Sequence, residues 1–282
     1  MKLTSPETVK KIMAKSGMKF NKSLGQNFLI DDGVLESIIE ASGVDGTCGV
    51  IEIGPGIGTL TQALAETAGK IVSIELDRQI AEYLRGAFAA YNNVEIIQGD
   101  AMKLDLTQIA AEHFNGMPVS IVANLPYYIT TPLIMKFLED TNGIDSVTVM
   151  IQKEVAERMT ALPSTSDYGA LSVAVQYRST PEIITLVPPD CFMPPPKVTS
   201  AVIRLEIKNH VKPEVENEKK LFKVVKAAFM HRRKTLVNSL AANFDTPKEQ
   251  LKALILEACG NENARAENLG IKEFEKISKN LQ

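Results

Sequence analysis

The chain has 282 residues, of which 45% are hydrophobic and 23% charged, a composition that suits one full globular domain and a smaller second one. No apolar run approaches the roughly 18 residues of a membrane-spanning helix. The three cysteines and three histidines are widely scattered, which argues against a disulfide scaffold and favours a reducing cytoplasm, and we expect no metal site.

The net charge of −3 hides a segregation of charge along the chain. Residues 1–30 and 221–240 have a basic excess, whereas residues 31–110 are strongly acidic. This asymmetry is typical of a protein with one surface that meets phosphates while the rest stays soluble. The alternative is that these lysines and arginines lie on solvated helix faces without a partner.

Short apolar runs alternate with amphipathic stretches over the first 180 residues. This alternation predicts a parallel sheet covered by helices on both faces. Two later runs have no long helix between them and predict an antiparallel edge pair that closes the sheet. The expected strands are 50–53, 71–75, 94–97, 120–123, 147–151, 182–187 and 200–207, and the stretches 59–67 and 78–90 are among the expected helices.

The last quarter of the chain reads as helical after a polar linker at 208–220. Helices are expected near 221–240, 247–259 and 271–280, and residues 246–249 have the form of a capping box. Thr131 and Pro132 give a similar helix-start signal. We therefore predict a basic N-terminal segment at 1–30, a sheet domain at 31–208 and a helical domain at 209–282.

Four successive predicted strands end in glycine or polar residues. The first is followed by the G-x-G-x-G run of Gly54, Gly56 and Gly58, whose spacing differs from the dinucleotide fingerprint. Glu75, Asp100 and Asn124 follow or end the next three strands. A tight turn or a helix cap could explain each feature alone. Together they predict one ligand crevice at the carboxyl edge of the sheet.

The segment NLPYYIT at 124–130 follows the fourth strand. The Asn124 oxygen can accept a hydrogen bond from an exocyclic amine while the Tyr127 ring stacks on the base that carries it. The alternative is an ordinary strand-to-helix turn, since Asn and Pro are common turn residues. Glu75 can accept ribose hydroxyls and Asp100 an adenine amine, so the crevice predicts S-adenosylmethionine as cofactor and methyl transfer to an amino group.

Six motifs together make the chain resemble the ribosomal RNA adenine dimethyltransferase family, in its small-subunit branch. The resemblance extends over essentially the whole chain and implies a class I methyltransferase-like α/β fold, with a doubly wound, mostly parallel seven-stranded sheet and a small helical C-terminal domain. The motifs are KSLGQNFL at 22–29, EIGPGIG at 52–58, NLPYYIT at 124–130, QKEVAER at 152–158, FMPPPKV at 192–198 and AFMHRRKTL at 228–236.

The resemblance also implies a substrate and a cofactor site. The substrate would be two adjacent adenosines in the 3′-terminal hairpin loop of 16S-type ribosomal RNA, each dimethylated at N6, within an immature 30S-type particle. We expect a monomer. The implied cofactor residues are Asn27, Leu29, Gly54, Gly56, Glu75, Asp100 and Asn124.

We assign the catalytic role to the loop that begins at Asn124. The Asn124 side-chain oxygen and the Leu125 carbonyl would accept the two N6 protons, with Pro126 in the same loop. Tyr127 would stack on one face of the extruded base and Phe192 on the other. For Phe192 the alternative is a core residue held by the prolines that follow it.

The RNA contacts are expected on the basic helix at 221–240. Arg232 falls among apolar positions of that helix, so it either pairs with a buried carboxylate or the helix breaks near His231, and we favour the break. The predicted RNA-binding residues are Lys22, Lys223, Lys226, Arg232, Arg233 and Lys234.

Several other functions share part of this pattern. A large-subunit ribosomal RNA methylase of the antibiotic-resistance type would share the pocket. A DNA adenine methyltransferase would need a target-recognition insert, and the glycine spacing disfavours a NAD oxidoreductase. From a different class, the chain could act chiefly by binding the immature small subunit, with methylation as an exit step.

Overall fold

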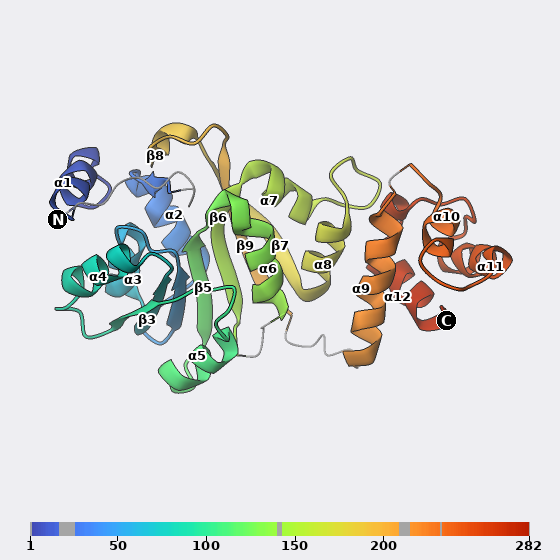
Figure 1. Cartoon of the computed structure of the whole chain (residues 1–282), viewed down its shortest axis with the longest axis horizontal. Coiled ribbons are helices and arrows are strands. Elements are labelled where there is room, and N and C mark those ends of the chain that lie inside the picture. The colour runs from blue at the N-terminus through green and yellow to red at the C-terminus, as the bar shows by residue number, and fades with distance from the viewer. Residues whose placement is uncertain (1, 17–25, 140–142, 209–214, 232, 282) are drawn as a thin grey trace. The chain divides into compact units, whose positions relative to one another are not determined.

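A computed structural model describes residues 2–16, 26–139, 143–208, 215–231 and 233–281, with the backbone alone for 215–217 (Figure 1). The chain divides into two compact units, described separately below. The first comprises residues 1–156 and 180–207, and the second 157–179 and 208–282. The predicted boundary at 208/209 lies one residue from the observed one. Residues 157–179 belong to the same unit as the C-terminal helices, which the prediction did not include. The sequence of this segment continues the alternation of apolar runs and amphipathic stretches seen in the first unit, so no pattern separates it.

The first unit is built on a mixed seven-stranded sheet, in the order β4-β3-β2-β5-β6-β9-β7, with helices on both faces (Figure 1). The strands from β4 to β6 pair in parallel, and β9 pairs antiparallel with β6. The predicted fold class and the antiparallel edge are confirmed. The strands are β2 Gly49–Ile53, β3 Lys70–Glu75, β4 Val94–Gln98, β5 Val119–Asn124, β6 Ser146–Gln152, β7 Ser179–Val187 and β9 Ser200–Ile207.

Side-chain caps define where several helices of this unit begin. Asp31 accepts a hydrogen bond from the Val34 amide at the start of α2, and Asp77 and Asp105 cap α4 and α5 in the same way. The helices are α1 Pro6–Ser16, α2 Asp32–Ser42, α3 Thr59–Thr67, α4 Arg78–Ala87, α5 Leu106–His113, α6 Thr130–Glu139 and α7 Lys153–Thr160, which crosses the boundary between the units.

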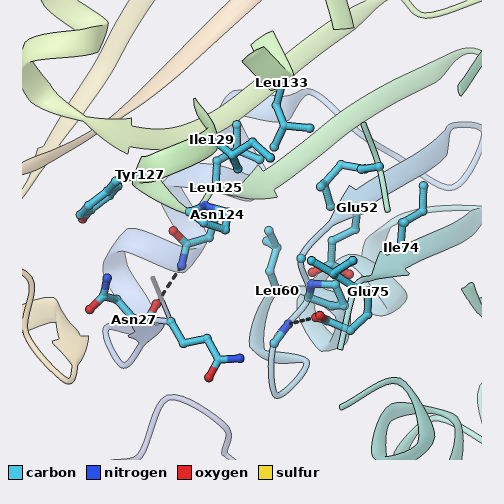
Figure 2. Close-up of a pocket in the computed structure, with 18 of the residues that line it drawn as sticks. Asn27, Glu52, Leu60, Ile74, Glu75, Asn124, Leu125, Tyr127, Ile129 and Leu133 are labelled. Carbon is cyan, nitrogen blue, oxygen red and sulfur yellow. Dashed lines mark hydrogen bonds between the residues drawn. The ribbon is translucent and has the colours of Figure 1, made fainter. Parts of the chain in front are cut away.

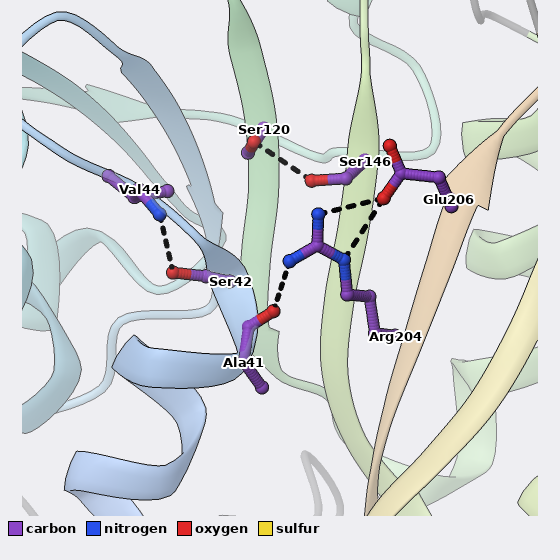
Figure 3. Close-up of polar contacts among 7 residues, drawn as sticks. All are labelled: Ala41, Ser42, Val44, Ser120, Ser146, Arg204 and Glu206. Carbon is purple, nitrogen blue, oxygen red and sulfur yellow. Dashed lines mark hydrogen bonds and ion pairs between the residues drawn. The ribbon is translucent and has the colours of Figure 1, made fainter.

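Arg204 ties the end of α2 to the antiparallel edge of the sheet (Figure 3). Its Nη1 donates to the Ala41 carbonyl at 2.6 Å, and its Nε and Nη2 donate to one oxygen of Glu206 on the same strand. Above them in the view of Figure 3, the Ser120 and Ser146 hydroxyls are 2.9 Å apart across β5 and β6. The two serine hydroxyls are buried, and their contact satisfies polar groups that would otherwise have no partner.

The N-terminal helix α1 belongs to the first unit rather than forming a separate segment. Val9, Ile12 and Met13 are buried and pack in one cluster with Phe28 and residues of α4. Beyond α1, the two-residue strand β1 (Phe28–Leu29) pairs antiparallel with β8 (Phe192–Met193). The pairing anchors the chain next to the carboxyl edge of the sheet.

The second unit consists of helices around a core of its own that includes Tyr168, Leu236 and Phe274. The single helix predicted at 221–240 is instead two helices separated by turn residues near His231, which confirms the favoured break. Helix α11 begins directly after Pro247, which is its N-cap and contributes no side-chain cap. The helices are α8 Ala170–Arg178, α9 Val215–Phe229, α10 Leu236–Ala241, α11 Lys248–Cys259 and α12 Ile271–Asn280. None of the described helices is long and apolar enough to span a membrane.

Candidate active site

One cavity of the first unit lies at the carboxyl edge of the parallel strands (Figure 2). Every residue predicted from the sequence to bind cofactor or to catalyse lines it, namely Asn27, Leu29, Gly54, Gly56, Glu75, Asp100, Asn124, Leu125, Pro126 and Tyr127. Parallel pairing explains this convergence, because neighbouring parallel strands end at one edge of the sheet. Whether these residues bind and catalyse remains a prediction.

Glu75 connects the end of β3 with the glycine loop. Its Oε1 accepts from the Asp77 amide at 2.9 Å and its Oε2 from the Gly56 amide at 3.4 Å. Burial raises the pKa of this carboxyl, and the backbone donors oppose that rise. The donors hold the carboxylate in one orientation at the cavity wall, where it can accept hydrogen bonds from ligand hydroxyls.

Gly54 leaves open space where the loop faces the cavity. Its φ is +66°, and a Cβ at this position would have no atom within 4 Å. An alanine there would therefore project into the volume a ligand must occupy. We expect Gly54→Ala to weaken S-adenosylmethionine binding about ten-fold or more, as measured by calorimetry.

Gly116 provides the matched control for this substitution. It also has a positive φ (+81°) and open space, but it does not line the cavity. Both alanine variants therefore have a similar backbone strain of about 1–2 kcal/mol. Equal cofactor affinity in the two variants would contradict a role for the Gly54 loop in ligand binding.

Glu52 is a cavity-lining carboxyl that our sequence reasoning did not assign to the site. It is 1% exposed, and its Oε2 accepts from the Thr61 and Ser73 hydroxyls at 2.7 and 2.6 Å. Its Oε1 is buried without a hydrogen-bond partner among the described residues, as is the nearby Thr59 Oγ1. Burial raises the pKa of Glu52 to about 7, against the effect of the two hydroxyls and reinforced by the charge of Glu75.

The raised pKa makes stability depend on pH in a specific direction. The folded chain binds the Glu52 proton more tightly than the unfolded chain, so this stabilisation is complete below about pH 4.5 and is lost as the pH rises through about 7. Relative to Glu52→Gln, the wild-type free energy of unfolding should fall by about 3 kcal/mol across that window. Denaturant titrations of both proteins at several pH values measure the difference. Parallel pH curves would show that the folded and unfolded chains bind the Glu52 proton equally tightly.

Asn124 has its side-chain amide oriented by the N-terminal segment. Its Nδ2 donates to the Asn27 backbone carbonyl at 3.1 Å, across the bottom of the cavity in Figure 2. Because a carbonyl can only accept, this contact requires the nitrogen to face Asn27 and leaves Oδ1 as the atom that can accept from a ligand amine. The Leu125 amide donates to the Met150 carbonyl at 3.1 Å, which holds the start of the loop.

Tyr127 and Phe192 lie in different environments. Tyr127 is half-buried at the cavity, and its hydroxyl is 2.6 Å from the Ser200 hydroxyl on β9. Phe192 is 2% exposed, pairs with Leu29 across β1 and β8 and packs in the core of the unit. This burial favours the core alternative for Phe192, and its stacking role stays a prediction.

Four of the six predicted RNA-binding residues lie in the described part of the second unit. Lys223, Lys226, Arg233 and Lys234 are exposed in the second unit, and the Lys223 Nζ lies 5.1 Å from the centroid of the Phe244 ring. Lys22 and Arg232 lie outside the described residues. The apolar lining that we did not predict includes Leu60, Ile74 and Leu133. Their positions are ordinary core positions of strands and helices, so no sequence signal separates them from the core.

Comparison with known proteins identifies the family. The model of the ribosomal RNA adenine dimethylase family matches residues 17–282. The chain belongs to the ribosomal RNA adenine dimethylase family. It is 49% identical to the ribosomal RNA small subunit methyltransferase A of Alkaliphilus metalliredigens, over 99% of this chain and 98% of that protein, and 44% identical to the Clostridioides difficile protein of the same name, over 98% and 96%.

Two solved structures share the fold of this chain. A dimethyladenosine transferase from Plasmodium falciparum aligns with a TM-score of 0.74 at 28% identity, covering 89% of this chain and 95% of that one. The 23S rRNA methyltransferase ErmE aligns with a TM-score of 0.68 at 26% identity, covering 90% and 99%. The resemblance inferred from the six sequence motifs is confirmed, as is its assignment to an enzyme family.

Proposed function

We propose that this dimethylase transfers methyl groups from S-adenosylmethionine to N6 of two adjacent adenosines in the 3′-terminal hairpin loop of small-subunit ribosomal RNA. The observation that carries the proposal is the Asn124 amide, held by the Asn27 carbonyl so that its oxygen is the available acceptor beside the cavity. The names of the full-length relatives support the small-subunit substrate. We also infer an immature 30S-type particle as partner, a monomeric enzyme and a cytoplasmic location.

The described residues fit the proposed cofactor. Open space at Gly54, an oriented carboxylate at Glu75 and the unpartnered buried oxygens of Glu52 and Thr59 suit a ligand that has hydroxyls and polar groups. Asn27 and Asp100 add polar groups around the same cavity. When bound, S-adenosylmethionine would supply a methyl group already activated on sulfur, so the chain needs no nucleophilic side chain.

The protein must instead activate the acceptor nitrogen. The N6 lone pair of adenine is delocalised into the ring and is a poor nucleophile. The Asn124 Oδ1 and the Leu125 carbonyl would accept hydrogen bonds from the two N6 hydrogens and draw the nitrogen toward tetrahedral geometry. This geometry frees the lone pair, and the two oxygens stabilise the developing positive charge. The base must first leave its stack, which costs a few kcal/mol, and stacking on Tyr127 would offset part of that cost.

The distribution of methyl groups among ribosomal RNAs tests the function. With tritiated S-adenosylmethionine, we expect label in the small-subunit RNA of undermethylated small subunits, as N6,N6-dimethyladenosine at two neighbouring positions. Naked small-subunit RNA, assayed in parallel, tests the requirement for an assembled particle. Label in large-subunit RNA alone would favour the ErmE-like alternative and overturn the proposal.

The second unit is proposed to hold the RNA backbone through α9 and the turn after it, which carries Arg233. Removing Lys223, Lys226 and Arg233 together should reduce the salt dependence of RNA binding by about one unit of slope per lost phosphate contact. Three exposed lysines of α12, Lys272, Lys276 and Lys279, provide a matched triple variant of equal charge change. Fluorescence anisotropy between low and high salt measures the salt dependence of RNA binding. An equal slope in both triple variants would show that α9 and the turn after it do not contact the RNA backbone.

A further inference from the structure

Two neighbouring tyrosines on one short helix line the cavity in different ways. Tyr127 and Tyr128 lie on the 3₁₀ helix η2 (Tyr127–Ile129) between β5 and α6. Tyr127 is half-buried and its hydroxyl contacts Ser200, whereas Tyr128 is 57% exposed. A 3₁₀ helix has three residues per turn, so side chains of successive residues leave its axis about 120° apart. The two rings therefore point in different directions from the helix axis and can contact different groups.

The exposure of Tyr128 suits it to contact a ligand rather than to pack in the core. It is the most exposed of the described aromatic residues around the cavity, since Phe28 is 6% exposed and Tyr127 is half-buried. Its ring loses little conformational freedom on contact, and it sits in the loop that holds Asn124 and Leu125. The burial of Phe192 leaves Tyr128 as the aromatic ring available for a second base.

We propose that Tyr128 stacks on the nucleobase next to the adenosine that occupies the cavity. This inference rests on the proposed function, in which the two targets are neighbours in one loop. When one base enters the cavity, the adjacent base must also leave the loop stack, and an exposed ring at the rim offers it a replacement stacking partner. The contact would position the RNA so that each base of the pair can take the cavity in turn.

A double-mutant cycle between protein and RNA tests this contact. The RNA is the small-subunit hairpin with an abasic site at either neighbour of the target adenosine, and the proteins are wild type, Tyr128→Ala and Tyr128→Phe. We expect Tyr128→Ala and one of the two abasic sites each to weaken RNA binding about ten-fold, with no further loss when they are combined. Tyr128→Phe keeps the ring and should bind as wild type does. Additive losses at both neighbouring positions would overturn the inference.

A second readout distinguishes stacking from a general structural effect. With 2-aminopurine in place of the coupled neighbour, binding to wild type and Tyr128→Phe should quench its fluorescence, and binding to Tyr128→Ala should not. S-adenosylmethionine affinity should be equal in all three proteins. Equal quenching with Tyr128→Ala would refute the contact even if activity fell. If wild type methylates neither adenosine in undermethylated small subunits, the proposed function itself fails, whereas normal methylation without coupling to Tyr128 refutes the further inference alone.

Discussion

Replacing Asn124 with alanine should reduce methyl transfer by about 100- to 1,000-fold or more while the affinity for S-adenosylmethionine falls only modestly. The reason is that the Asn124 Oδ1 would accept a hydrogen bond from the target amine in the transition state, and losses of this size are typical when one preorganised polar group is removed. The cofactor would keep its other proposed contacts around the cavity, among them Glu75 and the glycine loop. Single-turnover methylation and calorimetric titration measure the two quantities separately.

Asn243→Ala is a suitable control for this variant. Asn243 also donates through Nδ2 to a backbone carbonyl, that of Ser239 at 2.9 Å, but it is exposed and lies in the second unit. The Asn243→Ala variant should have a somewhat lower free energy of unfolding and should keep its turnover under conditions in which it is folded. Near-normal turnover of Asn124→Ala would refute the assigned role.

The Asn124 variant also separates catalysis from assembly. The chain could act mainly by binding the immature small subunit. In that case, cells whose only copy of this protein is the Asn124→Ala variant should mature their small subunits normally without the methyl groups. If methylation is required for maturation, immature particles should accumulate. Sucrose-gradient profiles of ribosomal particles distinguish these outcomes, provided that the variant binds the particle as wild type does.

Replacing Glu75 with alanine should weaken S-adenosylmethionine binding by about a hundred-fold. Two charge-assisted hydrogen bonds from ligand hydroxyls, each worth about 1.5–3 kcal/mol, would be lost, and the amides of Gly56 and Asp77 would lose their acceptor. Glu75→Gln keeps one acceptor oxygen and should show an intermediate loss. Calorimetric titration with S-adenosylmethionine measures both variants.

Glu95→Ala is the matched control on the neighbouring strand. Glu95 lies on β4, contacts His113 and Lys70, and does not line the cavity. Its removal should leave cofactor affinity unchanged. If Glu75→Ala and Glu95→Ala bind the cofactor equally well, Glu75 is a structural residue of the loop and not a ligand contact.

The sequence alone determined the sheet and the residues at its edge. Buried parallel strands read as short apolar runs, and parallel pairing requires that Gly54, Glu75, Asp100 and Asn124 meet at one edge whatever the details of packing. The break in the basic helix near His231 was also readable, because Arg232 would otherwise have fallen on the apolar face of a continuous helix.

The tertiary structure alone decided contacts between residues distant in the chain. The strand that pairs Phe192 with Leu29 places the Phe192 ring in the core, although we expected it to stack on a base. The Asn27 carbonyl orients the Asn124 side chain from 97 positions away. Glu52 reads as one residue of a buried strand, and its unpartnered oxygen became visible only once Thr61 and Ser73 were placed beside it. Local patterns encode periodicity and turn chemistry, whereas these contacts depend on how separate elements pack together.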